Sequence, residues 1–402
     1  MNKIYFYKFP IFSFIFTFIL LLTNIKSKKI SKLLSFKGEK ISKEYTNLIN
    51  YIKSNGGYVN PKLFPNEISD SNRYIITKQK IQKDEILLFS PDPILISKYH
   101  KYVNRKCIEA YGFEEEYDYE CIVYFMTIDK YNSTSVFKPY YEYFPKLNKN
   151  DYVFSFTEEE IEMFKDTGVT EGIHTYYYFL KKSLEPVEQK LKIFAEKNNI
   201  KYEQIIEEFK DNFMMVGTRN FGRPDSDFDI STMVPFLDLL NHSDKNNTHW
   251  FYDEMKGGYI LIAIRDIEKN EEITDSYGKY YNSMLYRTYG FVIPGNSYHD
   301  NVYIKIDGEG FYLDIDLLQS KVENMLDKLV KIKRFEFENA KNLILKSLND
   351  KKDYYLKLKT DRFSMNIIIK EHLDILNEYI SYINRYDIKQ SQIVSNSNYI
   401  NI

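Results

Sequence analysis

The segments MVPFLDLLNHSDKN (233–246) and IRDIEKNEEITDSYGKYYNSMLYRTYGFV (264–292) carry the pattern that decides the fold of this chain. In the first segment an apolar stretch ends directly before Asn241-His242-Ser243, so polar groups emerge where a buried element stops. In the second, Tyr277-Gly278 follows the mostly polar run EEITDS, and Tyr289-Gly290-Phe291 closes a stretch with helical spacing. Singly, each motif is only a turn or helix-end signal. Their order along one chain makes them informative.

Strand and helix patterns alternate around these motifs. Residues 74–77 and 85–89 predict two strands closed by prolines, and residues 248–252 and 258–264 predict a second pair. Between residues 98 and 220, apolar residues recur at helical spacing in four segments: 117–126, 158–164, 176–196 and 202–215. A capping-box pattern, Thr157 followed by Glu160, precedes the segment 158–164. Beyond residue 316, amphipathic segments with almost no Gly or Pro predict helices. The fold class expected is α+β.

Composition excludes several classes of protein. The 402 residues are 44% hydrophobic, which rules out wholesale disorder, and a formal net charge of -2 gives no global attraction to nucleic acid. The two cysteines, Cys107 and Cys121, cannot build a Cys-rich zinc cluster. They could close one bridge in an oxidising lumen, but buried free thiols are the expectation. His242, His249 and Asp238 match no usual zinc spacing, so no metal site is expected.

The N-terminal region is predicted to be a targeting segment. Lys3 and Lys8 precede the apolar run 9–22, so residues 1–27 predict a secretory signal peptide, or a signal anchor spanning 4–25 that would hold the chain in a membrane. Residues 28–43, rich in Lys and Ser, predict a transit-like segment or a linker. The expected location is the secretory pathway, a plastid reached through it, or a membrane if the segment is uncleaved.

Together and in this order, the motifs resemble the SET-domain methyltransferases, in the branch of the Rubisco large-subunit lysine methyltransferase. Further matches are LINYIKSNGGYVNPKL (48–63), FKPYYEYFPK (137–146), YVFSFTEEEIEMFK (152–165) and TRNFGR (218–223). The resemblance covers about residues 44–294. It implies a β-rich SET fold with a pseudoknot, formed by 44–97 and 221–300, that is split by a helical insertion at 98–220. It also implies an all-α substrate-binding domain at 301–390, followed by a disordered tail at 391–402.

The resemblance also implies an activity. Members transfer a methyl group from S-adenosylmethionine to a protein lysine by in-line displacement, and the enzyme aligns the reacting atoms and excludes water. The lack of Cys-rich flanks favours a non-histone protein substrate. Two alternatives stay open: a protein-histidine methyltransferase of the same branch, and a catalytically weak SET-like module that binds a partner protein.

By resemblance, individual residues receive roles. Tyr277 is the catalytic tyrosine between the cofactor pocket and the lysine channel. The candidate cofactor-binding residues are Asn72, Tyr74, Arg219, Asn241, His242 and Tyr289, and the candidate substrate-binding residues are Arg219, Arg223 and Asp238. Asn72 and Tyr74 depart from the family, which has a glycine pair where the backbone approaches the cofactor. A tyrosine there is expected to bring its ring into the cofactor space and weaken binding.

Overall fold

The protein, seen in a computed structural model, is described over residues 41–67, 73–112, 118–146, 149, 152–225 and 228–386. Residues from Glu44 onward form one compact unit. The predicted signal or anchor at 1–27, most of the transit-like segment at 28–43 and the tail at 391–402 lie outside the described residues. Among the helices described, none is long and apolar enough to cross a membrane.

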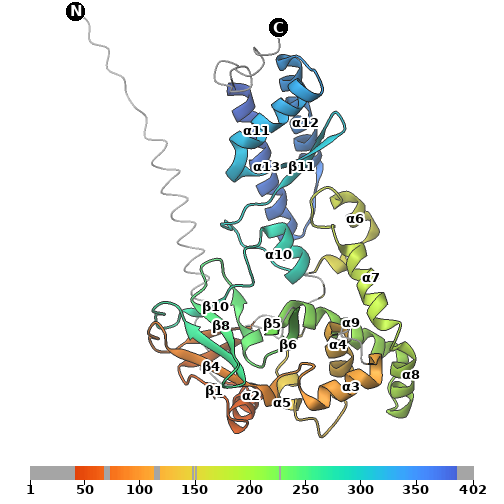
Figure 1. Ribbon diagram of the computed structural model, residues 1–402, viewed down its shortest axis with the longest axis vertical. Coiled ribbons are helices and arrows are strands. Elements are labelled where there is room, and N and C mark those ends of the chain that lie inside the picture. Colours follow the sequence, from red (N-terminus) through yellow and green to blue (C-terminus); the bar gives the residue numbers. More distant parts are fainter. Residues whose placement is uncertain are drawn as a thin grey trace, which may run out of the picture. The chain divides into compact units, whose positions relative to one another are not determined.

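Two four-stranded sheets combine strands from both sides of the helical insertion (Figure 1). The first sheet has the order β1 (Tyr58–Val59), β4 (Ile86–Pro91), β9 (Gly258–Ala263) and β8 (Thr248–Asp253). The second has the order β2 (Leu63–Glu67), β3 (Arg73–Thr77), β10 (Glu272–Asp275) and β7 (Asn241–His242). The four predicted strands are confirmed within two residues at their ends. The split of the β-rich unit by an insertion is confirmed too, because early and late strands share each sheet.

The insertion is helical, as predicted, but one boundary is wrong. Its helices are α3 (Lys101–Tyr111), α4 (Asp118–Asp129), α5 (Lys138–Tyr141), α6 (Glu158–Phe164), α7 (Ile173–Leu184), α8 (Glu188–Lys197) and α9 (Tyr202–Arg219). The single helix predicted over 176–196 is two helices, because Pro186 has no N–H to donate and its ring opposes the preceding turn. The capping box of α6 is confirmed: Glu160 N donates to Thr157 Oγ1 at 3.2 Å, and Thr157 N donates to Glu160 Oε2 at 2.8 Å.

The expectation of free thiols is wrong. Cys107 of α3 and Cys121 of α4 form a disulfide, with their Cα atoms 5.1 Å apart. The two helices pack against each other, which brings cysteines 14 residues apart within the distance that a bridge requires. Helical spacing within each segment gives no sign of this, since the pairing depends on how two helices meet.

The C-terminal region is not all-α, which corrects the prediction. It opens with a hairpin of β11 (Val302–Ile306) and β12 (Glu309–Leu313), and only then continues into α11 (Leu318–Asp327), α12 (Phe337–Lys357) and α13 (Phe363–Arg385). Asp307 and Gly308 turn the hairpin with φ of 49° and 82°. Asp-Gly between alternating apolar residues is a strong hairpin signal that the helix-based prediction overlooked. A second unpredicted hairpin, β5 (Asn220–Asp225) with β6 (Phe228–Met233), follows α9.

Two apolar cores divide the unit. The first lies between the sheets and helices α2 (Lys43–Ser54), α3, α4, α8 and α9. The second lies among the C-terminal helices and β11–β12, and it includes Val153, Phe164 and Val169 from the insertion. Helix α10 (Asn282–Tyr289) contributes Tyr286 to that second core. The insertion therefore packs on both the β-rich part and the C-terminal part of the chain.

Candidate active site

The two motif segments lie side by side because β7 pairs with β10 in parallel. Asn241 is opposite Thr274, and His242 is opposite Asp275. The backbone N–H of Tyr277 donates to His242 Nδ1 at 3.0 Å, and the Tyr277 hydroxyl donates to the Leu240 carbonyl at 2.7 Å. These bonds fix the phenol of Tyr277 at the end of the first segment.

A cavity of about 230 Å³ opens beside the Tyr277 ring. Its walls come from the end of α9, the start of β5, the approach to β7, strands β8 and β10, and the end of α10. The lining residues are Gly217, Thr218, Arg219, Asn220, Phe221, Gly222, Asp238, Leu240, Trp250, Asp275, Ser276, Tyr277 and Tyr289. Four of the residues predicted from sequence, Tyr277, Tyr289, Arg219 and Asp238, thus meet at one cavity.

Aromatic rings gather at one side of this cavity. The Tyr277 ring centroid lies 4.9 Å from that of Tyr289 and 5.2 Å from that of His242. Phe291 completes the group, with its centroid 6.1 Å from His242 and 6.2 Å from Tyr289. Such a surface suits the flat face of a heteroaromatic ligand.

His242 lies next to the Tyr277 ring and does not itself line the cavity. Burial lowers the pKa of His242, against a smaller opposing effect of Asp244, so the imidazole is neutral at physiological pH. Nδ1 accepts the Tyr277 N–H, which places the proton on Nε2. Nε2 is buried and has no acceptor among the described residues.

Arg219 and Asp238 form the charged wall of the cavity. Nη1 of Arg219 donates to the Asp238 backbone carbonyl at 2.5 Å, and its buried Nε has no acceptor among the described residues. Asp238 is 3% exposed. Burial raises the pKa of the Asp238 carboxyl to about 6, despite the opposing effects of the Arg219 guanidinium and the Tyr140 hydroxyl. A guanidinium with an unused donor suits a ligand carboxylate.

Comparison with known proteins fits this geometry. The family model described as the SET domain matches residues 72–278, which is just over half of the chain. The chain belongs to the SET-domain family.

Relatives of this SET-domain chain include enzymes from yeast and zebrafish. Ribosomal lysine N-methyltransferase 4 of Saccharomyces cerevisiae is 24% identical over 294 residues, covering 64% of this chain and 57% of that protein. The N-lysine methyltransferase setd6 of Danio rerio is 25% identical over 249 residues, covering 55% of this chain and 50% of that protein. The chain therefore spans about half the length of the curated relatives that it matches.

Solved structures show the same fold. The SET domain of LSMT bound to lysine and AdoHcy aligns with a TM-score of 0.60 at 14% identity, covering 86% of this chain and 92% of that one. Rubisco LSMT bound to AdoMet aligns equally, with a TM-score of 0.60 at 14% identity over 86% and 92% of the two chains. At this identity the likeness establishes the α+β SET fold.

Besides His242, two described residues predicted to bind the cofactor are not among the residues that line the cavity: Tyr74 and Asn241. Tyr74 is held on β3, where its hydroxyl accepts from Asn66 Nδ2 of β2 at 2.6 Å, and it does not line the cavity. The expected intrusion of its ring into the cavity is therefore not seen. Asn72 lies outside the described residues. Asn241 is exposed at the strand end, and its Nδ2 donates to Glu272 Oε1 at 2.9 Å and to the Arg73 carbonyl at 3.4 Å.

Arg223 does not reach the cavity. Its guanidinium lies between two rings, 4.2 Å from the centroid of Tyr99 and 4.1 Å from that of Tyr252, and 3.5 Å from Asp92 Oδ1. Tyr252 also donates to Asp92. Arg223 therefore anchors hairpin β5–β6 to neighbouring elements through cation–π contacts. Its proposed contact with a substrate has no geometric support here.

Sequence reasoning missed four residues that the structure places in the site. Phe221, Trp250 and Asp275 line the cavity, and Phe291 completes the aromatic group. Burial raises the pKa of Asp275 to about 6. Phe291 and Asp275 belong to the quoted motif 264–292, so the sequence contained a signal that could have found them. Phe221 and Trp250 are distant in sequence, and only folding brings their rings edge to face with centroids 5.2 Å apart.

The raised pKa of Asp238 gives a first prediction. Folding raises the pKa of the Asp238 carboxyl from 3.8 to about 6, so the folded state favours the protonated carboxyl. The free energy of unfolding is therefore highest below pH 3.8 and falls as the pH rises through 6, where the buried carboxyl must ionise. We expect Asp238→Asn to unfold with a higher free energy than wild type at pH 8, by up to about 3 kcal/mol, and to lose this advantage by pH 4. Urea unfolding at both pH values measures it. An equal difference at the two pH values would show that Asp238 does not titrate in this window.

Proposed function

We propose that this SET-domain chain is an S-adenosylmethionine-dependent protein-lysine N-methyltransferase that acts on a non-histone protein. The observation that carries the proposal is the meeting of Arg219, Tyr277 and Tyr289 on one cavity beside the aromatic surface of His242 and Phe291. The named activities of the relatives, lysine N-methylation in yeast and zebrafish, support it.

The site residues fit the cofactor. Its carboxylate needs a cation, and Arg219 has an unused Nε donor. Its adenine needs an aromatic surface, which Tyr289 offers at the cavity with Phe291 behind it, 6.2 Å away between ring centroids. When bound, S-adenosylmethionine supplies an activated methyl group on a sulfonium. Tyr74, which stands where the family has a glycine, does not line this cavity.

The phenol of Tyr277 is placed to assist the transfer. The Tyr277 hydroxyl donates its hydrogen bond to the Leu240 carbonyl, so the lone pairs of the phenol oxygen are left to accept a hydrogen bond from an amine in the cavity. Burial raises the pKa of this phenol, which keeps it neutral. Phe221 and Trp250 line the same cavity and exclude water from the stem of a lysine side chain. A neutral lysine amine held by this oxygen would be placed to receive the methyl group that bound S-adenosylmethionine supplies.

Cofactor binding tests the proposal against the binding-module alternative. We expect S-adenosylmethionine to give a heat of binding with wild type, and Asn241→Ala to weaken the affinity about tenfold, because its amide fixes the end of β7 to Glu272 and Arg73. Asn246→Ala is the matched control, since Asn246 Nδ2 donates to the Thr248 carbonyl away from the cavity. No heat from wild type would overturn the proposal and favour the module that binds a partner protein.

The acceptor is the second part of the proposal. Mass spectrometry of lysate proteins after incubation with the enzyme and isotope-labelled cofactor identifies the modified residue. Label on lysine is the expected result. Label on histidine alone would favour the protein-histidine alternative.

We also propose that the chain enters the secretory pathway, in line with the apolar run 9–22. The Cys107–Cys121 disulfide supports this, because such bridges persist in oxidising compartments. After entry, the chain could be held in a membrane through residues 4–25 or delivered to a plastid, and both destinations belong to this proposal. Imaging a C-terminal fluorescent fusion in the source cell, with and without residues 1–43, tests it. A cytosolic signal from the full chain would contradict it.

A further inference from the structure

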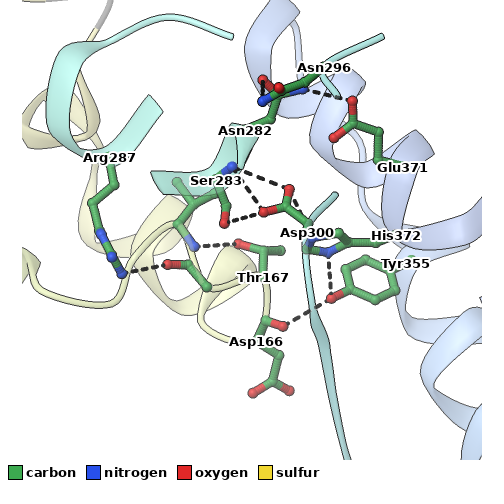
Figure 2. A network of polar contacts seen from close by, with 12 residues as sticks. Asp166, Thr167, Asn282, Ser283, Arg287, Asn296, Asp300, Tyr355, Glu371 and His372 are labelled. Atoms are coloured by element: carbon green, nitrogen blue, oxygen red, sulfur yellow. Dashed lines mark hydrogen bonds and ion pairs between the residues drawn. The ribbon is translucent and has the colours of Figure 1, made fainter. Parts of the chain in front are cut away.

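A polar network that is buried at Asp300 and His372 lies outside the cavity and connects three regions that are distant in sequence (Figure 2). It contains Asp166 from the insertion, Ser283 at the start of α10, Asp300 from the loop before β11, Tyr355 of α12 and His372 of α13. None of these residues lines the cavity, and the proposed methyl transfer does not use them.

Asp300 caps helix α10 from outside that helix. The N-cap residue Tyr281 makes no side-chain capping bond. Instead, the Ser283 N–H donates to both carboxylate oxygens of Asp300 at 3.2 Å, and Ser283 Oγ donates to Oδ1 at 2.7 Å. A carboxylate at the start of a helix satisfies free N–H groups and opposes the positive end of the helix dipole.

His372 lies against this carboxylate on the other side. The side chains of His372 and Asp300 are 1% and 0% exposed, and Nε2 lies 3.4 Å from Asp300 Oδ2. On the far side of the ring, Nδ1 lies 2.9 Å from the Tyr355 hydroxyl, which donates to the Asp166 carbonyl at 3.1 Å. The cap of α10 is thus tied through α13 and α12 to the insertion.

A second set of bonds fixes the same helix end. Asn282 Nδ2 donates to the Ile293 carbonyl at 2.9 Å and to Glu371 Oε1 at 2.7 Å, while Ile293 N donates to Asn282 Oδ1 at 2.8 Å. Glu371 precedes His372 on α13. Glu371 of α13 therefore contacts the first residue of α10 directly, and His372 reaches the second, Ser283, only through Asp300.

Helix α10 transmits this placement to the site. Ser283 and Tyr289 are six residues apart, or about 9 Å along the axis, in one uninterrupted helix. Tyr289 lines the cavity, and Phe291 follows directly after the helix. Because α10 is short and continuous, a change in the position of its first turn moves the ring of Tyr289.

We propose that Asp300 and His372 are positioning residues for the methyl transfer: they fix the start of α10 and so hold Tyr289 and Phe291 at the cofactor surface. This rests on the proposed function only for the identity of the ligand. The placement of α10 itself is a property of the protein without ligand.

The first test measures the helix in the absence of cofactor. We expect Asp300→Asn to raise amide hydrogen exchange in residues 286–290 about tenfold over wild type, because the charged cap and its contact with His372 are weakened. Ile344→Val is the matched control: Ile344 is fully buried in α12, and its loss of about 1 kcal/mol lowers stability without touching the network. Equal exchange in Asp300→Asn and Ile344→Val would overturn the proposal.

The second test measures S-adenosylmethionine affinity in the same variants. We expect about tenfold weaker binding for Asp300→Asn and for His372→Asn, and a smaller loss for His372→Gln, whose amide can reach Asp300 as Nε2 does. Ser283→Ala, which keeps the backbone cap, serves where Asp300→Asn fails to fold, and a loss of about threefold is expected. Affinity equal to that of Ile344→Val in all variants would refute the positioning role.

The two failures are distinguishable. Absence of binding in wild type, with faster exchange in Asp300→Asn, would refute the proposed function and leave the placement of α10 intact. Normal binding in wild type, with exchange and affinity unaffected in Asp300→Asn, would refute the positioning role alone.

Discussion

Tyr277→Phe should lower the rate of methyl transfer by about 10²- to 10³-fold and leave S-adenosylmethionine affinity within about twofold of wild type. The phenylalanine ring keeps the contacts with Tyr289 and His242, which lie 4.9 and 5.2 Å from the Tyr277 ring. Only the oxygen that accepts from the amine, and its bond to the Leu240 carbonyl, are lost. Incorporation of labelled methyl into lysate protein measures the rate, and calorimetry measures the affinity.

Tyr280→Phe is the matched control for this change. The Tyr280 ring lies 6.3 Å from that of Tyr289, but Tyr280 does not line the cavity. We expect its rate to stay within about twofold of wild type. Turnover in Tyr277→Phe equal to that in Tyr280→Phe would remove Tyr277 from the catalytic role.

Arg219→Leu should destabilise the protein by about 3 kcal/mol at pH 7, because it leaves the buried Asp238 carbonyl without a donor and removes the positive charge that favours the ionised Asp238 carboxyl. The double variant Arg219→Leu with Asp238→Asn should recover a large part of this loss, since the buried charge is then gone. Urea unfolding of the two single variants and the double variant measures the coupling.

An exposed arginine provides the control for this experiment. Arg265, whose side chain is 48% exposed, pairs with Glu271 at 2.6 Å, and Arg265→Leu should change the unfolding free energy by less than about 1 kcal/mol. Strictly additive effects of Arg219→Leu and Asp238→Asn would show that the two side chains do not interact, and would contradict the charged wall described here.

The candidate site was predictable in part, at residues that belong to the motifs carrying the family resemblance. Tyr277 and Tyr289 were named from sequence, and the structure brings both to one cavity. Arg223 was named from its motif as well, yet its guanidinium lies between the rings of Tyr99 and Tyr252. A motif gives the residue and its place on the chain, whereas the direction of a long side chain depends on which rings and carboxylates surround it after folding.

The sequence by itself determined four strands of the two sheets (β3, β4, β8 and β9), the capping box of α6, the helical insertion and the order of the motifs, because hydrophobic period and cap chemistry act over a few residues. Only the tertiary structure decided the parallel pairing of β7 with β10, the Cys107–Cys121 bridge and the capping of α10 by Asp300, which His372 supports from α13. Each of these joins separate elements, some of them far apart in sequence. Such contacts form because the apolar faces of different elements must be buried together, and no local pattern records which faces will meet.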